Sequence, residues 1–442
     1  MRSLKAIGAS AAALALTLSV AACGGGDDAG SGSDAASGGD VTIKIQTFNN
    51  MGFSAPTDTR PGADLWSKYE ADNPGVKIEE TVAATSDDAR AAFNTAIQAG
   101  TASFDIFAVE IDWLPSIQAI PDSFLDLNPF VGDNDWLDWK LKQGTTLDGS
   151  KLLGMGTDIG PQGICYRADL LDAAGIASDR DAVKEWLGGD DATWDDFFKA
   201  GAEYMDKSGG KAFFDSSAAI FQGMINQIEY SWVDADGNII ADTNADAKTA
   251  YDKLTAAAVA GQSAGLGQWS DAWNAGMSTD QFAAQLCPAW LVNNIRGAAG
   301  DDFVGWDIAD VFPGGGGNWG GSFLVVPEAS AVKEDAAKLV AYITSPDAQA
   351  EVFATAANFP SSPTALGMEQ VTSRMEPFLN NAPIGEIYAN RAAAVTVVPF
   401  KGAQYFEIQT SMADALNRVD VDKSMDPAAS WAQFLNDVDA LK

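Results

Sequence analysis

Two carboxylates and an indole ring follow directly after the apolar segment at residues 104–110. Glu110 and Asp112 lie two positions apart, so both carboxylates would face the same side of an extended chain, and Trp113 comes next. Carboxylates accept hydrogen bonds from hydroxyl groups, and a pair of them can hydrolyse a glycosidic bond without histidine. An indole ring offers an apolar face for stacking. This group predicts a site for a ligand that carries both hydroxyl groups and apolar surfaces.

A second candidate is the glycine-rich segment PGGGGNWGGSF at residues 313–323, which places Trp319 among six glycines. Such a segment can bind phosphate through its backbone N–H groups, or it can keep side chains away from an aromatic face. It lacks the Lys-Ser/Thr ending of a nucleotide-binding loop. We therefore expect an exposed ligand-binding face on Trp319, with Asn318 and Ser322 beside it. The alternative is a surface loop in which Trp319 folds back onto the protein.

Further candidates follow the ends of predicted strands, where α/β sheets place ligands. They are Phe48, Asn49 and Asn50 after the first strand, and Trp290 after the segment that contains Cys287. Packing in the core is the alternative for each aromatic ring. By contrast, Trp66, Trp186 and Trp194 lie in helical patterns and are predicted to be buried.

The composition excludes several kinds of chemistry. The chain has no histidine, which removes His-based catalytic triads and most zinc sites. Its 27 basic and 61 acidic residues give a formal net charge of −34, whereas phosphate binding by a nucleic-acid-binding protein requires concentrated Lys and Arg. We therefore expect no metal, no cofactor and no nucleic-acid partner.

The N-terminal residues have the pattern of an export signal, because a short basic start precedes an apolar stretch of small residues. Val20-Ala21-Ala22-Cys23 resembles the bacterial lipobox, in which the cysteine is lipidated and becomes the new N-terminus. The following residues, up to 40, contain no apolar side chain larger than alanine. The sequence thus predicts a signal peptide at residues 1–22, then lipidated Cys23 and a flexible linker at 23–40. Secretion with cleavage near Ala22 is the alternative.

From residue 41 onward, strand and helix patterns alternate. Residues 41–47, 75–79 and 104–110 are typical of strands, and residues 63–73 and 88–100 are typical of helices. This alternation predicts an α/β fold with a mainly parallel sheet. Beyond Cys23 the chain has only two cysteines, Cys165 and Cys287, and in an exported protein these two favour one disulfide over two free thiols.

Five segments resemble, in order, the family 1 extracellular solute-binding proteins of bacterial ABC sugar importers. They are TDIGPQGICYRADLLDAAGI, a Trp-Asp-Asp helix, QFAAQLCPAW, WDIADVFPGGGGNWGGSFLVVPE and AAKLVAYITSPDAQAEVF. The resemblance covers essentially the whole chain after Cys23. It implies an α/β, two-lobed periplasmic-binding-protein-like fold with hinge crossovers and a ligand cleft between the lobes.

The resemblance also implies where the parts lie. One lobe would take residues 41–157 and 316–358, and the other 158–315 and 359–442, which places both Cys165 and Cys287 on strands of the second lobe. Asp158 would lie in the first crossover, and Tyr405 would be another aromatic ligand contact, with Lys401 and Gln404 nearby. Asp158 could instead cap the hinge, and Lys401 could be a solvated charge.

The resulting expectation is a monomeric, non-catalytic receptor, held at the outer face of the cytoplasmic membrane by lipidated Cys23. Its ligand would be a carbohydrate, a di- or oligosaccharide, and its partners an ABC permease with a cytoplasmic ATPase. The 13 tryptophans agree with a sugar ligand, because sugars present apolar C–H faces that stack on aromatic rings. Two alternatives remain open: a surface-anchored glycoside hydrolase that uses Glu110 and Asp112, and the same fold with another solute such as a polyol.

Overall fold

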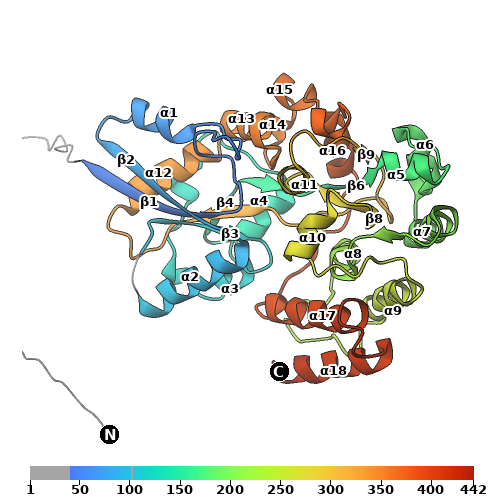
Figure 1. Ribbon diagram of the computed structural model, residues 1–442. Coiled ribbons are helices and arrows are strands. Elements are labelled where there is room, and N and C mark those ends of the chain that lie inside the picture. The colour runs from blue at the N-terminus through green and yellow to red at the C-terminus, as the bar shows by residue number, and fades with distance from the viewer. Residues whose placement is uncertain (1–39, 101–102) are drawn as a thin grey trace, which may run out of the picture. The chain divides into compact units, whose positions relative to one another are not determined.

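The computed structural model describes residues 40–100 and 103–442. Within them two β-sheets, each covered by helices, form the two lobes of an α/β fold (Figure 1). The predicted signal peptide, the lipidation of Cys23 and the linker fall outside the described residues.

The first sheet has five strands in the order β2-β1-β3-β10-β4. Its strands are β1 (Val41–Phe48), β2 (Val76–Ala83), β3 (Ile106–Glu110), β4 (Gly154–Gly156) and β10 (Ser322–Val325). β1 is parallel to both β2 and β3, whereas β10 is antiparallel to β3 and β4. The predicted strands of the N-terminal part are therefore confirmed, and a distant segment, β10, is inserted between β3 and β4.

The second sheet has four strands in the order β7-β8-β6-β9. They are β6 (Gln162–Arg167), β7 (Ala212–Phe214), β8 (Phe282–Pro288) and β9 (Trp306–Ala309). Here β6 is antiparallel to both of its neighbours, β8 and β9. Between the two sheets, β5 (Asp158–Ile159) and β11 (Phe359–Pro360) form a short antiparallel pair. The expected hinge crossover at Asp158 thus has a β-structure of its own.

Helices surround both sheets. The first sheet is packed by α1 (Leu65–Asp72), α2 (Ser86–Ala99), α3 (Leu114–Gln118), α4 (Asp138–Gly144) and α12 (Lys333–Ile343). The second is packed by α5 (Ala168–Ala173), α6 (Arg180–Trp186), α7 (Trp194–Ser208), α8 (Ser217–Ile225), α9 (Ala245–Val259), α10 (Asp271–Gly276), α11 (Leu291–Ala299), α16 (Ile384–Ala393), α17 (Tyr405–Asp420) and α18 (Pro427–Asp439). Three helices follow α12 near the hinge: α13 (Pro346–Ala356), α14 (Pro363–Leu366) and α15 (Glu369–Thr372). Short 3-10 turns lie at Pro121–Ser123, Asn128–Phe130, Gly189–Asp191 and Pro377–Leu379.

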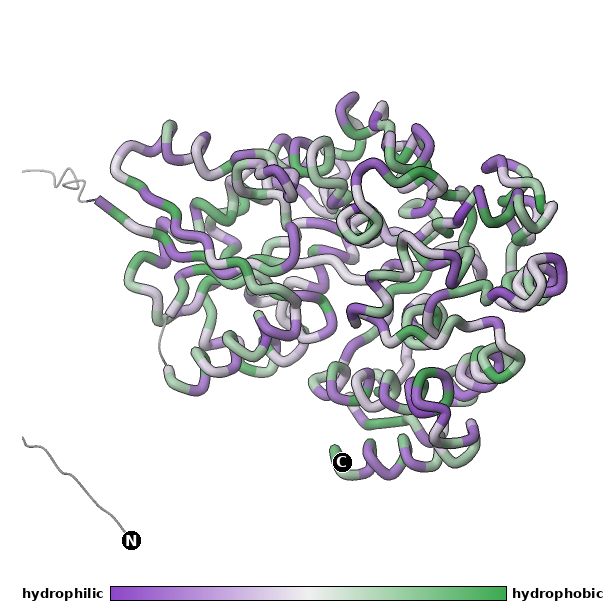
Figure 2. Tube along the Cα trace, in the orientation of Figure 1, coloured by the Kyte–Doolittle hydropathy of each residue, from purple (hydrophilic) through white to green (hydrophobic). Residues whose placement is uncertain are grey.

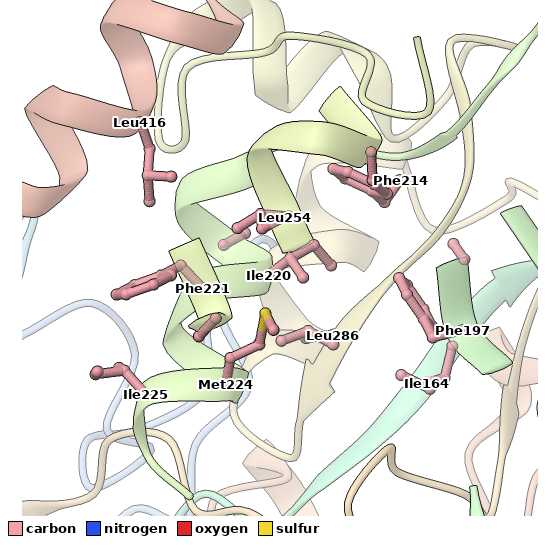
Figure 3. Close-up of a cluster of buried hydrophobic side chains, with 14 of the residues drawn as sticks. Ile164, Phe197, Phe214, Ile220, Phe221, Met224, Ile225, Leu254, Leu286 and Leu416 are labelled. Carbon is pink, nitrogen blue, oxygen red and sulfur yellow. The ribbon is translucent and has the colours of Figure 1, made fainter. Parts of the chain in front are cut away.

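Hydropathy alternates along the helices around both sheets, as Figure 2 shows. In the second lobe α8 packs on β8, with Ile220 and Met224 close to Leu286, whereas Phe221 points away from Leu286 (Figure 3). Gly223 of the same helix permits this contact, since a Cβ there would lie 2.5 Å from a methyl group of Leu286.

The three tryptophans predicted to be buried are only half-buried. Trp66, Trp186 and Trp194 pack one side of the ring on a core, and each donates its indole N–H to a polar side chain. The acceptors are Glu80 at 3.1 Å, Glu203 at 3.0 Å and Gln227 at 2.8 Å, respectively. The polar end of the ring explains why burial is incomplete.

The predicted disulfide joins Cys165 of β6 to Cys287 of β8, with 5.3 Å between the two Cα atoms. In the antiparallel register Gly163 lies opposite Cys287, so the bond spans neighbouring strands diagonally. No helix in the described residues is both long enough and apolar enough to cross a membrane.

Candidate functional site

A cavity of about 380 Å³ lies between the two lobes. Loops that follow strands of the first sheet line one side of it. Residues from α8, α11, α17 and the loop before α10 line the other side. Of the candidates from the sequence, nine line this cavity: Phe48, Asn49, Asn50, Glu110, Asp112, Asp158, Trp290, Trp319 and Ser322.

The sheet topology explains why distant residues meet there. β1 and β3 are parallel neighbours, so Phe48 and Glu110, at their carboxyl ends, reach the same edge of the sheet. β10 is antiparallel, and its first residue, Ser322, pairs with Glu110. The glycine-rich segment, which directly precedes β10, therefore lies at the same edge of the sheet as Phe48 and Glu110.

Three tryptophans form a continuous aromatic wall of the cavity. The ring centroids of Trp319 and Trp290 lie 5.4 Å apart in an edge-to-face contact, and those of Trp290 and Trp269 lie 6.1 Å apart and nearly parallel. Trp269 is 45 % exposed, whereas Trp319 is only 7 % exposed. Trp269 also has a φ of 70°, in the left-handed region that bulky side chains rarely adopt. Its ring is therefore the open aromatic face of the site.

The wall is held from behind. Trp290 donates its indole N–H to the carbonyl of Trp319 at 2.9 Å. Behind Trp269 lies Trp273, with 5.0 Å between the ring centroids, and Trp273 donates its indole N–H to the buried Asp215 carboxylate at 2.7 Å. These contacts fix the ring planes before any ligand arrives.

The glycines have a different role from the one expected. Trp319 lines the cavity but is largely covered, since it packs into the core of the second lobe, and its backbone N–H donates to the carbonyl of Gly160 at 2.8 Å. A Cβ on Gly160 would lie 1.8 Å from the Trp319 carbonyl oxygen, and one on Gly316 would lie 2.3 Å from the Ala394 carbonyl oxygen. The glycines permit close backbone packing at the crossover rather than a freely exposed Trp319 face.

Two carboxylates present a free oxygen to the cavity. Asp158 accepts through Oδ1 from the backbone N–H of Ser322 at 2.9 Å and from the hydroxyl of Thr157 at 2.8 Å. Glu110 accepts through Oε2 from the backbone N–H of Asp112 at 2.7 Å. The second oxygen of each group accepts no hydrogen bond from the described residues. Each can therefore accept from a ligand hydroxyl.

Charged groups lie unusually deep beside these acceptors. Burial, helped by the nearby Asp112 charge, raises the pKa of Glu110 to about 8. Burial lowers the pKa of Lys140 to about 7 against the opposing effect of Asp158 and Glu110. The Lys140 ammonium lies 3.7 Å from the centroid of the Phe323 ring and behind Gly321, where a Cβ would be 3.0 Å from it.

Two amide side chains add unpaired groups to the cavity. Gln222 of α8 has a buried Oε1 with no partner, and Gln268 has a buried Nε2 with no partner, among the described residues. An unpaired buried polar atom costs free energy unless a ligand or water satisfies it. These two atoms are positioned to exchange hydrogen bonds with a polar ligand.

Two of the aromatic candidates do not reach the cavity, and the expectation that their faces bind ligand is corrected. Trp113 is 2 % exposed and packs on Phe93, with 5.3 Å between the ring centroids. It belongs to the core because the chain turns after Glu110 instead of staying extended. Tyr405 is fully buried at the start of α17, with the Lys401 ammonium 4.3 Å from its ring centroid.

Three polar candidates do not line the cavity, and two of them, Lys401 and Asn318, have structural contacts instead. Lys401 forms an ion pair with Asp112 and is only 6 % exposed, so it is not a solvated charge. Asn318 accepts from the backbone N–H of Gly160 at 2.8 Å and donates to the carbonyl of Gly320 at 3.0 Å. Gln404 is the half-buried residue that precedes α17.

The sequence reasoning missed most of the second lobe's contribution. The missed lining residues include Gln222, Gln268, Trp269, Asn294, Asp414 and Asn417. Trp269 stands before the Ser-Asp start of α10, a helix-capping signal that marks a loop and could have drawn attention to it. The others lie on helices, where one sequence gives no sign of which face meets the cavity. No cluster of three or more His, Cys, Asp or Glu side chains suited to a metal ion occurs in the described ranges.

Comparison with known proteins agrees with this architecture. Residues 64–377 match the sequence profile of the family described as bacterial extracellular solute-binding protein. The chain belongs to this family of extracellular binding proteins.

Solved structures place the chain more narrowly. One crystal structure of a family 1 extracellular solute-binding protein is 40 % identical, with a TM-score of 0.80 over 90 % of this chain and 99 % of the other. An ABC transporter associated binding protein from B. animalis subsp. lactis Bl-04, solved with beta-1,6-galactobiose, is 18 % identical, with a TM-score of 0.71 over 90 % and 96 %. The GacH receptor of Streptomyces glaucescens GLA.O is 16 % identical, with a TM-score of 0.68 over 89 % and 96 %. No curated protein matches the chain.

Proposed function

We propose that this chain is a substrate-binding protein that captures a di- or oligosaccharide in the cleft between its lobes and delivers it to an ABC permease. The observation that carries the proposal is that the aromatic wall of Trp269, Trp290 and Trp319 shares one cavity with unpaired hydrogen-bonding groups. A sugar ring needs this combination, because its C–H face is apolar and its edge carries hydroxyl groups.

The hydrogen-bonding groups suit hydroxyl groups in particular. Glu110 and Asp158 supply acceptors, Gln222 an amide oxygen and Gln268 an amide N–H. A hydroxyl group both donates and accepts, so it can satisfy either kind of partner. Similar folds solved with beta-1,6-galactobiose and with maltose support a carbohydrate over a polyol, although their identity to this chain is only 18 % and 15 %.

The proposal includes a binding set and lobe boundaries. The ligand contacts are the nine candidates in the cavity together with Gln222, Gln268 and Trp269. The lobes comprise residues 41–157 with 316–358, and residues 158–315 with 359–442. The membership of β10 in the first sheet and the pairing of β5 with β11 between the sheets support these boundaries.

Lipidation of Cys23 anchors the monomer to the outer face of the cytoplasmic membrane. The export pattern and the lipobox-like Val20-Ala21-Ala22-Cys23 support this. A Cys23→Ala variant, compared with the unchanged protein after metabolic labelling with a fatty acid, tests it. The fatty-acid label should be incorporated into the unchanged protein and be absent from the variant. If neither protein is labelled, the chain is secreted without a lipid anchor and this part of the proposal is wrong.

Thermal unfolding of the purified protein with and without sugars tests the binding function. The panel contains cello-, xylo-, malto- and galacto-oligosaccharides. A ligand at a hundredfold over its dissociation constant adds about 2.7 kcal/mol to the free energy of unfolding, which raises the midpoint. If no series raises the midpoint, the carbohydrate proposal is wrong, and the panel moves to polyols and other solutes.

Recovery of the sugar separates binding from hydrolysis. Asp112 is held in an ion pair with Lys401, and its backbone N–H is bonded to Glu110, so these carboxylates act as one structural cluster. We therefore expect the stabilising sugar to be recovered intact after long incubation. Shortened products that disappear in a Glu110→Gln variant would establish the hydrolase instead.

A further inference from the structure

The charged residues that line the cavity all have the same sign. Among the described lining residues there are five carboxylates, namely Asp87, Glu110, Asp112, Asp158 and Asp414, and no lysine or arginine. They come from both sides of the cleft, since Asp87 lies in the first turn of α2 and Asp414 in α17.

Three cations near the cavity are already engaged with protein groups and are not free to pair with a ligand. Lys401 is paired with Asp112, and its side chain is 6 % exposed. Arg90 is paired with Glu407 at 2.5 Å, and its guanidinium carbon lies 3.7 Å from the centroid of the Phe406 ring. Lys140 is 1 % exposed and its ammonium lies over the ring of Phe323. None of these three residues lines the cavity.

An anionic ligand would therefore meet like charges without a cation to pair with. Its carboxylate or phosphate would lose water on entering a cleft whose described residues offer only uncharged donors in return, namely N–H groups and the hydroxyl groups of serine and threonine. Burial first, and the Asp112 charge second, raise the pKa of Glu110 to about 8. Protonation of Glu110 does not change the sign of the charge that lines the cavity. Asp112 is paired with Lys401, so the carboxylates of Asp87, Asp158 and Asp414 are the ones that still meet the ligand without an ion-pair partner in the described part of the chain.

We infer that the cavity selects its sugar by charge: it takes neutral or amine-bearing sugars and rejects uronic acids and sugar phosphates. This inference rests on the proposed sugar-binding function, and it specifies the class of sugar that the site binds. An amino group would be accommodated because Asp87 and Asp414 have no ion-pair partner among residues 40–100 and 103–442. Like-charge contacts across an interface suppress wrong partners in the same way.

The test compares ligands of one shape and two charges. Cellotriose, maltotriose and beta-1,6-galactobiose are screened first, with trigalacturonate as an anionic probe. The neutral sugar that binds is then oxidised at its primary hydroxyl groups to the uronate, and part of the uronate is converted to the neutral carboxamide. Titration calorimetry gives the affinity of both forms.

We expect the carboxamide to bind roughly 100-fold more tightly than the uronate, as several like charges in a cleft imply. A difference below about tenfold overturns the charge selection while the sugar-binding function stands. Binding of trigalacturonate without binding of any neutral sugar would also overturn the charge selection and leave the sugar-binding function in place. If no sugar of either kind binds, the proposed function itself is overturned, and the selection with it.

Charge-reversal variants show whether the lining acids cause the selection. Asp414→Lys places a cation at the cavity, and Asp422→Lys makes the same charge change at an exposed position outside it. The ratio between carboxamide and uronate should fall by about tenfold or more in Asp414→Lys and stay unchanged in Asp422→Lys. An equal effect of both would assign the selection to the net charge of the protein and overturn the role of the cavity.

Discussion

The tryptophans of this chain have different surroundings that their side-chain type alone does not reveal. Trp113 is enclosed by the aromatic core of the first lobe, whereas Trp319 and Trp269 line the cavity, the first largely covered and the second well exposed. Energetic contributions to ligand binding usually concentrate on such an aromatic anchor within a desolvated pocket. At the residue scale, the binding energy should therefore rest mainly on Trp269.

The first prediction follows from that exposure. Trp269→Ala should weaken sugar binding by about 1–3 kcal/mol, because the stacking surface is removed. The fold should persist, since the ring is 45 % exposed. Titration calorimetry with the stabilising sugar measures the change.

Trp186→Ala is the matched control, because Trp186 is half-buried on α6, packs on Phe213 and does not line the cavity. It should lower the unfolding temperature without changing the affinity. Equal affinities in the unchanged protein and Trp269→Ala would contradict the stacking surface.

At this scale the sequence predicted the position of a residue well where the sheet topology determines it, and poorly where a turn determines it. Phe48 and Glu110 were predicted because strand ends of an α/β sheet gather at one edge, whereas Ser322 was predicted only as a neighbour of Trp319. Trp113 was misplaced because a tight turn, which one sequence does not reveal, follows Glu110. Trp269 was missed because its ring reaches the cavity through packing beside Trp273 and Trp290, which one sequence does not reveal.

At the element scale, ion pairs connect segments that are far apart in the sequence. The loop after β3 meets the segment before α17 through Asp112 and Lys401, and α2 meets α17 through Arg90 and Glu407. The first pair is nearly enclosed, with 14 % and 6 % of the two side chains exposed, whereas 41 % of Glu407 is exposed. Burial should make the consequences of breaking them very different.

We predict that Lys401→Ala lowers the free energy of unfolding by about 3–5 kcal/mol, because it leaves the Asp112 carboxylate buried without its partner. Glu407→Ala, which breaks the more exposed pair, should cost about 0–1 kcal/mol. Urea unfolding of both variants at pH 7 makes the comparison. Similar losses in the two variants would show that burial does not distinguish these pairs.

The disulfide is the covalent link between elements, and it joins β6 to β8 across 122 residues of chain. A Cys165→Ala, Cys287→Ala double variant should lose about 4–5 kcal/mol on the chain-entropy estimate for a loop of this length. Binding should remain at temperatures below the new midpoint, because neither cysteine lines the cavity. Calorimetric unfolding gives the midpoints, and a midpoint unchanged from that of the oxidised protein would contradict the prediction.

Element boundaries were predictable where a capping signal exists. Thr193 begins α7 with a capping box to Asp196, and Gly100 ends α2 in a left-handed conformation, as their residue types indicate. The insertion of β10 between β3 and β4 carries no such local signal, because it depends on contacts more than 150 residues away in the sequence. Only the resemblance to a family placed that segment in the first lobe.

At the scale of the whole molecule, two buried acids make the folded state bind protons that the unfolded chain releases. Burial raises the pKa of Asp215 from 3.8 to about 7, against a lowering by the Trp273 hydrogen bond. Burial and then Asp112 raise the pKa of Glu110 from 4.5 to about 8. Acids with lowered pKa values, such as Asp148 at about 2, finish titrating at lower pH.

Between roughly pH 5 and 7 the folded protein therefore holds more protons than the unfolded chain, and its free energy of unfolding should fall as pH rises. Above pH 7 the lowered pKa of Lys140, at about 7, acts in the opposite direction, since the unfolded chain then holds the extra proton. Asp215→Asn keeps an oxygen for the Trp273 indole N–H and removes the charge. The Asp215→Asn variant should therefore show a smaller fall of the free energy of unfolding between pH 5 and 7. It should be more stable than the unchanged protein at pH 7 but not at pH 5. Urea unfolding at pH 5, 6 and 7 measures both profiles, and parallel profiles would mean that Asp215 does not titrate in this range.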